Sequence, residues 1–401
     1  MSRPLPEAES NKKVASSVQD VLENKPAFGS RFLTEEDDVW SQNAWDHVPP
    51  PDDQVETIEK SLSKQRLNPV PLEDKIKLNE KPAKHWDNFY KMNADNFFRN
   101  RKWLHNEFPE LVDATKADGG AVSITEVGCG AGNSVFPLLA SNQNPELYIR
   151  AYDYSSHAVK LVQNNPLYTN PPTGKIQASV WDVTSANSLP SDLAPGSADI
   201  VIMVFVMSAL HPDEWGQAIN NVHKILKPGG VVLFRDYGRY DLTQLRFKGG
   251  RLLDENFYIR GDKTRVYFFE LDELSLLFTG NNLSENKLET TISTTEVAQD
   301  EDGNDIHTPS PEVNAEKQGL SSLSSCSVIS ESSLSTEGSM CTPPIPAPTV
   351  IHPNLLSPLS NCPPHPLFAA EQLGVDRRLI VNRKRQIKMY RVWMQGKFRK
   401  L

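Results

Sequence analysis

The sequence contains no uninterrupted apolar run of about 18 residues, so no transmembrane helix is expected. Its first thirteen residues hold two glutamates and no apolar core, which argues against a secretory signal and against a mitochondrial transit peptide. The chain has only four cysteines, none with paired metal-ligand spacing. We therefore expect no disulfide framework, no metal site and a reducing, cytoplasmic compartment.

The sequence also lacks an excess of basic residues, and its formal net charge is −9. That charge comes from one segment, residues 281–366, which holds eleven acidic and two basic residues. Removing these from the totals of 51 and 42 leaves 40 of each sign in the rest of the chain. The balanced remainder keeps a nucleic-acid ligand open.

Composition divides the chain into segments of different character. Residues 1–80 are polar with little periodicity, so we expect them to be mostly disordered, apart from a short aromatic, possible tRNA-binding segment at about 31–48. Residues 82–280 and 367–401 are rich in apolar groups and are predicted to form one domain. The acidic, Ser/Thr/Pro-rich residues 281–366 are predicted to be a disordered insertion in that domain.

Strand-like and helix-like patterns alternate through the apolar part. Strands are predicted at residues 123–127, 147–153, 176–182, 199–206 and 231–236. This rhythm indicates an α/β fold with a doubly wound, mostly parallel sheet. Two further apolar runs, at residues 378–382 and 390–394, are expected to complete the sheet edge as a C-terminal β-hairpin.

A glycine-rich loop follows the first strand, Glu126-Val-Gly-Cys-Gly-Ala-Gly-Asn133. Gly128 and Gly130 would let the backbone approach a ligand closely, although a tight strand-to-helix turn explains the same glycines. The spacing lacks the final part of the dinucleotide fingerprint, and no P-loop lysine is present to hold phosphates. The loop therefore predicts a cofactor other than a dinucleotide or a nucleoside triphosphate.

Acidic residues accompany this loop. Asp153 and Asp182 each end one of the next two strands, where a carboxylate could accept hydrogen bonds from ribose hydroxyls or lie near an adenine amino group. Glu126 could pair with the ammonium of a cofactor that carries an amino-acid moiety. Each acid alone is equally consistent with a solvated loop or a helix cap. Together the pattern resembles class I (Rossmann-like) S-adenosylmethionine-dependent methyltransferases.

Basic residues interleave with aromatic ones in three blocks outside this loop. The blocks are residues 96–103, residues 245–269 and the tail from residue 377. Such blocks suit stacking on bases and contact with phosphates, although solvated basic faces explain them as well. The candidate RNA-binding residues are Arg99, Arg101, Lys102, Arg246, Arg260, Arg265, Arg377 and Arg378.

Longer motifs resemble one family, the tRNA N3-methylcytidine methyltransferases. They include His85-Trp-Asp87, Phe97-Phe-Arg-Asn-Arg101, the glycine loop, Phe205 to Pro212, Leu233-Phe-Arg-Asp-Tyr-Gly238, Asn256-Phe-Tyr258 and Met389-Tyr-Arg-Val-Trp393. Arg31-Phe-Leu33 and Asn43-Ala-Trp-Asp46 are similar to the branch of that family that acts on threonine tRNA. The insertion at residues 281–366 is absent from the family pattern.

The resemblance implies S-adenosylmethionine as cofactor and methyl transfer to N3 of the cytidine at position 32 in the tRNA anticodon loop. The tRNA would be that for threonine, with serine and arginine tRNAs as further candidates. A helper protein such as an aminoacyl-tRNA synthetase would be a possible partner, and no membrane is implied. The implied cofactor contacts are Trp86, Tyr90, Gly128, Asp153, Asp182, Val183 and Val204.

Neutral cytosine has a free lone pair at N3, so the reaction needs alignment and desolvation rather than a general base. Asp236, after the fifth strand, is the candidate for contacting the base, although a structural turn acid is an alternative. His211 is expected to cap the helix that follows Pro212. Two other functions stay open: a methyltransferase acting on a protein or small molecule, and a non-catalytic RNA-binding module.

Overall fold

The computed structural model describes residues 19–20, 32–48, 54–186, 189–283 and 351–401, which belong to one compact unit. The disorder expected for the rest of residues 1–80 and for residues 284–350 lies outside the described residues. Within the described part of the chain, no helix combines the length and apolarity needed to cross a bilayer.

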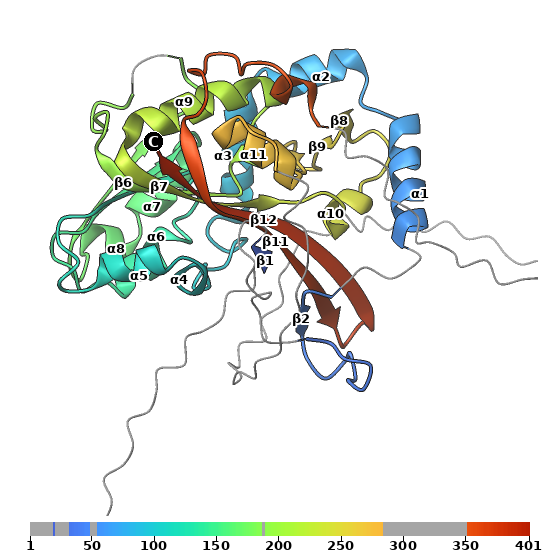
Figure 1. The fold of residues 1–401 in the computed structure, drawn as a ribbon, viewed down its shortest axis with the longest axis horizontal. Coiled ribbons are helices and arrows are strands. Elements are labelled where there is room, and N and C mark those ends of the chain that lie inside the picture. Colours follow the sequence, from blue (N-terminus) through green and yellow to red (C-terminus); the bar gives the residue numbers. More distant parts are fainter. Residues whose placement is uncertain (1–18, 21–31, 49–53, 187–188, 284–350) are drawn as a thin grey trace, which may run out of the picture. The chain divides into compact units, whose positions relative to one another are not determined.

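The central sheet has the order β1-β11-β12-β7-β6-β3-β4-β5. Five neighbouring strands are parallel, and β12 joins them antiparallel at β7. The doubly wound, mostly parallel sheet with its C-terminal hairpin is confirmed, and the long hairpin of β11 and β12 extends from the main body (Figure 1). The strands are β3 (Ser123–Val127), β4 (Tyr148–Asp153), β5 (Lys175–Val180), β6 (Ala198–Val204), β7 (Leu226–Tyr237), β11 (Phe368–Asn382) and β12 (Ile387–Lys400).

Helices cover both faces of this sheet, with α9 and α11 over one core cluster and α5, α6 and α7 over the other. The helices from residue 82 onward are α3 (Pro82–Asn93), α4 (Leu104–Glu107), α5 (Pro109–Thr115), α6 (Val135–Ala140), α7 (Ser156–Gln163), α8 (Pro166–Thr169), α9 (Trp215–Ile225), α10 (Leu242–Leu245) and α11 (Leu271–Thr279). A small antiparallel sheet consists of β8 (Leu252–Asp254), β9 (Phe257–Ile259) and β10 (Arg265–Tyr267). Short 3-10 turns lie at residues 207–209 and 212–214, where the His211 side chain accepts the Asp213 N–H and caps the turn.

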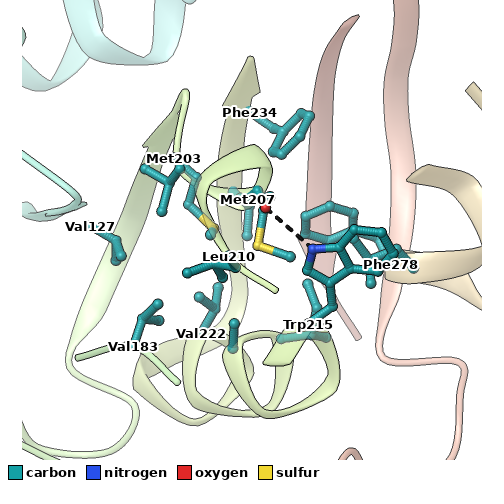
Figure 2. Packing of buried hydrophobic residues seen from close by; sticks show 14 of the residues in the cluster. Val127, Val183, Met203, Met207, Leu210, Trp215, Val222, Phe234 and Phe278 are labelled. Carbon is teal, nitrogen blue, oxygen red and sulfur yellow. Dashed lines mark hydrogen bonds between the residues drawn. The ribbon is translucent and has the colours of Figure 1, made fainter. Parts of the chain in front are cut away.

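Alternate residues of β6 enter two different cores, which explains the continuous apolar run of that strand. Val201 and Met203 join the cluster beneath α9 and α11, whereas Ile202 and Val204 join the cluster beneath α5, α6 and α7. In the first cluster, the indole Nε1 of Trp215 donates to the carbonyl of Met207 at 3.2 Å (Figure 2). That bond ties α9 to the turn that follows β6.

The N-terminal region contains two helices, so the expectation that residues 1–80 are mostly disordered does not hold for residues 54–79. These helices are α1 (Gln54–Leu67) and α2 (Leu72–Asn79). A glutamine anchors α1: Gln65 is 1% exposed, donates to the carbonyls of Gln244 and Phe247, and accepts from the Tyr258 hydroxyl. A polar residue provides this burial, so apolar periodicity does not reveal the helix.

The short aromatic segment lies on the protruding hairpin. β2 (Ala44–Asp46) pairs antiparallel with β11, as do the two residues of β1 (Gln19–Asp20). Trp45 is buried against Leu379 and Val381 of β11, and its indole N–H donates to the Val39 carbonyl at 2.8 Å. The segment therefore extends the sheet edge of the same domain (Figure 1).

The predicted insertion ends earlier than residue 366, because residues 351–366 pack on the domain. Leu355 is buried in the main core, and the His352 N–H donates to Glu273 of α11 at 3.0 Å. The Leu283 N–H donates to the neighbouring Asp272 at 3.1 Å. Leu283 and His352 thus both bond to the first turn of α11.

Gly216 allows the returning segment to lie against α9, because a Cβ there would overlap the carbonyl of Ser360. We expect Gly216→Ala to lower the free energy of unfolding by about 1–2 kcal/mol, although alanine is the better helix former by up to about 1 kcal/mol. Urea denaturation measures the change. Gly261→Ala is the matched control, because the nearest atom to its added Cβ lies 4.0 Å away. Equal stability of both variants would contradict close packing at Gly216.

Candidate functional site

The glycine loop lies at the carboxyl end of β3, where the chain order of the sheet reverses. In open α/β sheets this is the edge that binds ligands. Gly128, Gly130 and Gly132 have φ angles of 66°, 56° and 86°, which strongly favour glycine. A Cβ would lie 2.6 Å from Val206 at Gly128 and 2.5 Å from the Tyr90 hydroxyl at Gly130. The loop therefore needs glycine for both conformation and space.

Asp153 is the last residue of β4, and its carboxylate holds the glycine loop in place through hydrogen bonds. One carboxylate oxygen accepts the Gly130 N–H at 2.9 Å, and the other accepts the Ser155 N–H at 2.8 Å. Burial raises the pKa of Asp153 to about 6, against the opposing effect of these two hydrogen bonds. Each carboxylate oxygen has a second lone pair, so Asp153 can accept further hydrogen bonds from a ligand.

Glu126 is fully buried beside the loop, and among the described residues neither of its oxygens has a hydrogen-bond partner. The Arg101 guanidinium lies 3.5 Å away. Burial raises the pKa of Glu126 to about 7, because it outweighs the nearby positive charge of Arg101. A buried carboxylate with unused acceptors, next to a loop that admits no side chain, fits the ammonium end of an amino-acid cofactor.

Helix α3 covers the loop with two aromatic side chains. The rings of Trp86 and Tyr90 stack with centroids 6.0 Å apart, and Tyr90 lies over Gly130. Asp87 attaches the helix to the start of α7 by accepting from the Ser155 hydroxyl at 2.7 Å and from the His157 N–H at 3.1 Å. Tyr90 therefore packs directly on the loop and Trp86 stacks on Tyr90, while their contact with a cofactor stays a prediction.

The other predicted cofactor residues lie along the same sheet edge. Asp182 is exposed, and one of its oxygens accepts from the backbone N–H and hydroxyl of Thr184. Val183 is 5% exposed, and Val204, at the end of β6, is 1% exposed. Their contacts with a cofactor stay a prediction.

Asp236, the candidate for contacting the base, has no exposed surface in this structure. One oxygen accepts the Ser208 N–H at 2.9 Å and the other the Tyr237 N–H at 2.8 Å. Burial raises its pKa to about 6. Asp236 thus fixes the turn after β6, and direct contact with a base stays a prediction.

Phe205 begins that turn, and the sequence gives it a place in a family motif but no role at the site. Its ring centroid lies 4.7 Å from that of Tyr237, and the Arg101 guanidinium carbon lies 5.7 Å from the Phe205 ring centroid. Arg101 also donates to the Ser134 hydroxyl at 3.0 Å. An aromatic residue directly after a fully buried strand is the signal that could have identified it.

Two of the candidate RNA-binding arginines already use their charges in interactions within the domain, and their contact with RNA stays a prediction. Arg265 is 3% exposed and donates to the Ala209 carbonyl, Asn79 and Glu214. Arg378 lies 3.1 Å from Asp376 and 3.4 Å from Asp46, which joins β11 to β2. Sequence alone does not distinguish these paired arginines from a basic surface.

The other candidates differ in exposure. Arg101 points inward to Glu126, and Arg260 is half-buried with its guanidinium carbon 5.5 Å from the Tyr237 ring centroid. The exposed candidates are Arg99, Lys102, Arg246 and Arg377. Their contact with RNA stays a prediction.

Comparisons with known proteins agree with this site. A methyltransferase domain family matches residues 125–232, from the glycine loop to β7. A tRNA(Thr) (cytosine(32)-N(3))-methyltransferase of Saccharomyces cerevisiae is 41% identical over 92% of this chain, which spans only 45% of that relative's length. A tRNA N(3)-methylcytidine methyltransferase of Schizosaccharomyces pombe is 39% identical, over 98% of both chains. A tRNA N(3)-cytidine methyltransferase of Danio rerio is 40% identical over 65% of this chain and 81% of its own.

The near-complete match to the fission-yeast protein covers the glycine loop, β4 and β5 with Asp153 and Asp182, the turn after β6 and the C-terminal hairpin. Relatedness at this identity and length includes every element that forms the site. The chain therefore belongs to the family of S-adenosylmethionine-dependent tRNA N3-methylcytidine methyltransferases.

Proposed function

We propose that this chain transfers a methyl group from S-adenosylmethionine to N3 of cytidine 32 in the anticodon loop of threonine tRNA. Serine and arginine tRNAs are further candidate substrates, and the cytoplasm is the proposed compartment. The observation that carries the proposal is that Glu126 is buried beside a glycine loop at the ligand-binding edge of the sheet, with Arg101 3.5 Å away and no hydrogen bond to its oxygens among the described residues.

The residues around the loop fit the cofactor. Glu126 would bind the ammonium of the cofactor. Asp153 would accept hydrogen bonds from its ribose, and Asp182 would lie near its adenine. Gly128 and Gly130 would let the cofactor lie close to the backbone of the loop. Trp86, Tyr90, Val183 and Val204 would provide the remaining apolar contacts. When bound, the cofactor supplies a methyl group on a positively charged sulfur.

The chain itself has to align and desolvate the acceptor, since N3 of cytosine needs no deprotonation. Because N3 lies on the pairing edge, the base must be unpaired and turned out of the loop stack. Asp236 would contact the exposed base edge after a small movement of the turn that it fixes. No residue is assigned a proton transfer at the methylation step.

The exposed cations Arg99, Lys102, Arg246 and Arg377, with half-buried Arg260, are proposed to contact phosphates of the anticodon stem-loop. Arg99 and Lys102 flank Arg101, which reaches the glycine loop. A phosphate-binding surface next to the site would bring the loop nucleotide to the methyl donor.

Methylation of matched anticodon stem-loops by the purified chain tests the function. We expect 3-methylcytidine, detected by nucleoside mass spectrometry, with C32 and none when C32 is replaced by uridine. Addition of the cognate aminoacyl-tRNA synthetase tests whether a helper protein is needed. Methylation of a protein or small molecule with no product on any tRNA, even with the synthetase, would overturn the proposal. Absence of cofactor binding by calorimetry would instead favour a non-catalytic RNA-binding module.

A further inference from the structure

Phe205 has an unusual backbone conformation for a large aromatic residue. Its φ angle is 61°, in the left-handed region that bulky side chains rarely adopt. Its N–H donates to the Arg235 carbonyl at 2.8 Å, which continues the pairing of β6 with β7. Strained conformations of this kind are often associated with functional sites and persist only where surrounding contacts enforce them.

Those enforcing contacts come from residues next to Phe205 in the same turn. The following residue, Val206, packs against Gly128 of the cofactor loop. Two positions further on, the Ser208 N–H donates to fully buried Asp236, and the Ala209 carbonyl accepts from buried Arg265. The turn is thus held on both sides, so the direction of the half-buried Phe205 ring is determined by the fold.

The ring already lies beside a cation. The Arg101 guanidinium carbon is 5.7 Å from the ring centroid, within the range of cation–π attraction. Tyr237, next to Asp236, lies 4.7 Å away with an interplanar angle of 41°. Arg101 also lies 3.5 Å from Glu126 and donates to the Ser134 hydroxyl at 3.0 Å, so the ring is only one of its three interactions.

The proposed reaction creates a cation at this place. The lone pair of cytosine N3 forms the new N–CH3 bond while the S–CH3 bond breaks and its electron pair stays on sulfur. No proton leaves in this step, so the pyrimidine ring gains one positive charge and the sulfonium becomes a neutral thioether. An aromatic face against the ring would stabilise that charge as it develops.

We infer that Phe205 is a catalytic residue and that the target cytosine stacks on its ring, on the side where Arg101 now lies. The π face of Phe205 then stabilises the positive charge of the methylated base. The inference rests on the proposed function and adds to it the residue that contacts the reacting base. Simple core packing is the alternative role, because one side of Phe205 contacts the apolar cluster beneath α5, α6 and α7.

Replacement of Phe205 by phenylalanines with one, two and three ring fluorines tests the inference. Fluorine withdraws electrons from the π face while it changes the ring's size little. We expect the single-turnover methylation rate of a C32 stem-loop to fall stepwise, by about 10-fold in total, with KM changed less than 2-fold. The same series at Phe278, which stacks on Phe398 in the core, is the matched control and should leave the rate unchanged.

Binding of the product provides a readout that packing alone would not change. A stem-loop with cationic 3-methylcytidine at position 32 should lose affinity through the fluorine series, whereas one with uridine there should not. A flat rate and flat product affinity through the series, with wild-type thermal stability, would overturn the role of Phe205 and leave the proposed function intact. Failure of the wild-type chain to form 3-methylcytidine would overturn the proposed function itself.

Discussion

Glu126→Gln is expected to stabilise the free protein and to weaken cofactor binding. A buried carboxyl whose pKa rises from 4.5 to about 7 is protonated in the fold at pH values where it ionises in the unfolded chain. The folded wild type therefore loses stability as the pH rises from about 4.5 to 7, by up to roughly 3 kcal/mol. Glutamine has no such charge, so the stability advantage of the variant should grow over this pH interval and then stay constant.

Cofactor affinity should have the opposite pH dependence. Ionised Glu126 attracts an ammonium, so we expect S-adenosylhomocysteine to bind the wild type more tightly as the pH rises through 7. Glu126→Gln should bind it about 10–100-fold more weakly at pH 8, with little dependence on pH.

Urea denaturation and titration calorimetry, each at pH 5, 6, 7 and 8, measure the two effects. Asp153 and Asp236 also have pKa values raised to about 6, so their ionisation lowers the stability of both proteins equally as the pH rises. Comparison of the two proteins therefore isolates Glu126. A variant with wild-type affinity at all four pH values would refute the ammonium contact.

Gly128→Ala should nearly abolish cofactor binding. Alanine is strained at a φ angle of 66°, and its Cβ would lie 2.6 Å from Val206. The free loop can relax to another conformation, so the cost of restoring the native one appears when the cofactor binds. Strain and overpacking together amount to about 3 kcal/mol, which corresponds to roughly 100-fold in Kd.

The double variant Gly128→Ala/Val206→Ala separates the two causes. Truncation of Val206 removes the steric contact but not the φ strain, so calorimetry should show recovery of part of the affinity, about 10-fold. Val206→Ala alone is the control, because it measures the effect of truncating Val206 on cofactor affinity when Gly128 is kept. No recovery in the double variant would mean that conformation alone explains the loss.

The parallel sheet and the glycine loop could be predicted because their determinants are local. A strand buried on both faces requires a continuous apolar run, and a loop with positive φ angles requires glycine. Helix α1 and the returning segment at residues 351–366 could not be predicted in this way. Their anchors are Gln65 and the His352 N–H, whose partners lie far away in the sequence.

The basic residues show the same limit at the site. Arg99, Arg265 and Arg378 look alike in the sequence, as arginines in blocks of mixed aromatic and basic residues. In the structure, Arg99 is exposed while Arg265 is buried against the turn after β6 and Arg378 lies between two aspartates. Burial and charge pairing depend on which strands meet, and that depends on contacts between distant residues.

The sequence by itself determined the parallel strands, the glycine loop and the family, because periodicity, glycine positions and long motifs are properties of neighbouring residues. The tertiary structure alone decided that Glu126 is buried 3.5 Å from Arg101, that Asp236 holds the turn after β6, and that Phe205 faces Arg101. Those features require β3, β6 and β7 to lie side by side and residue 101 to approach them, so they arise only from the packing of the whole domain.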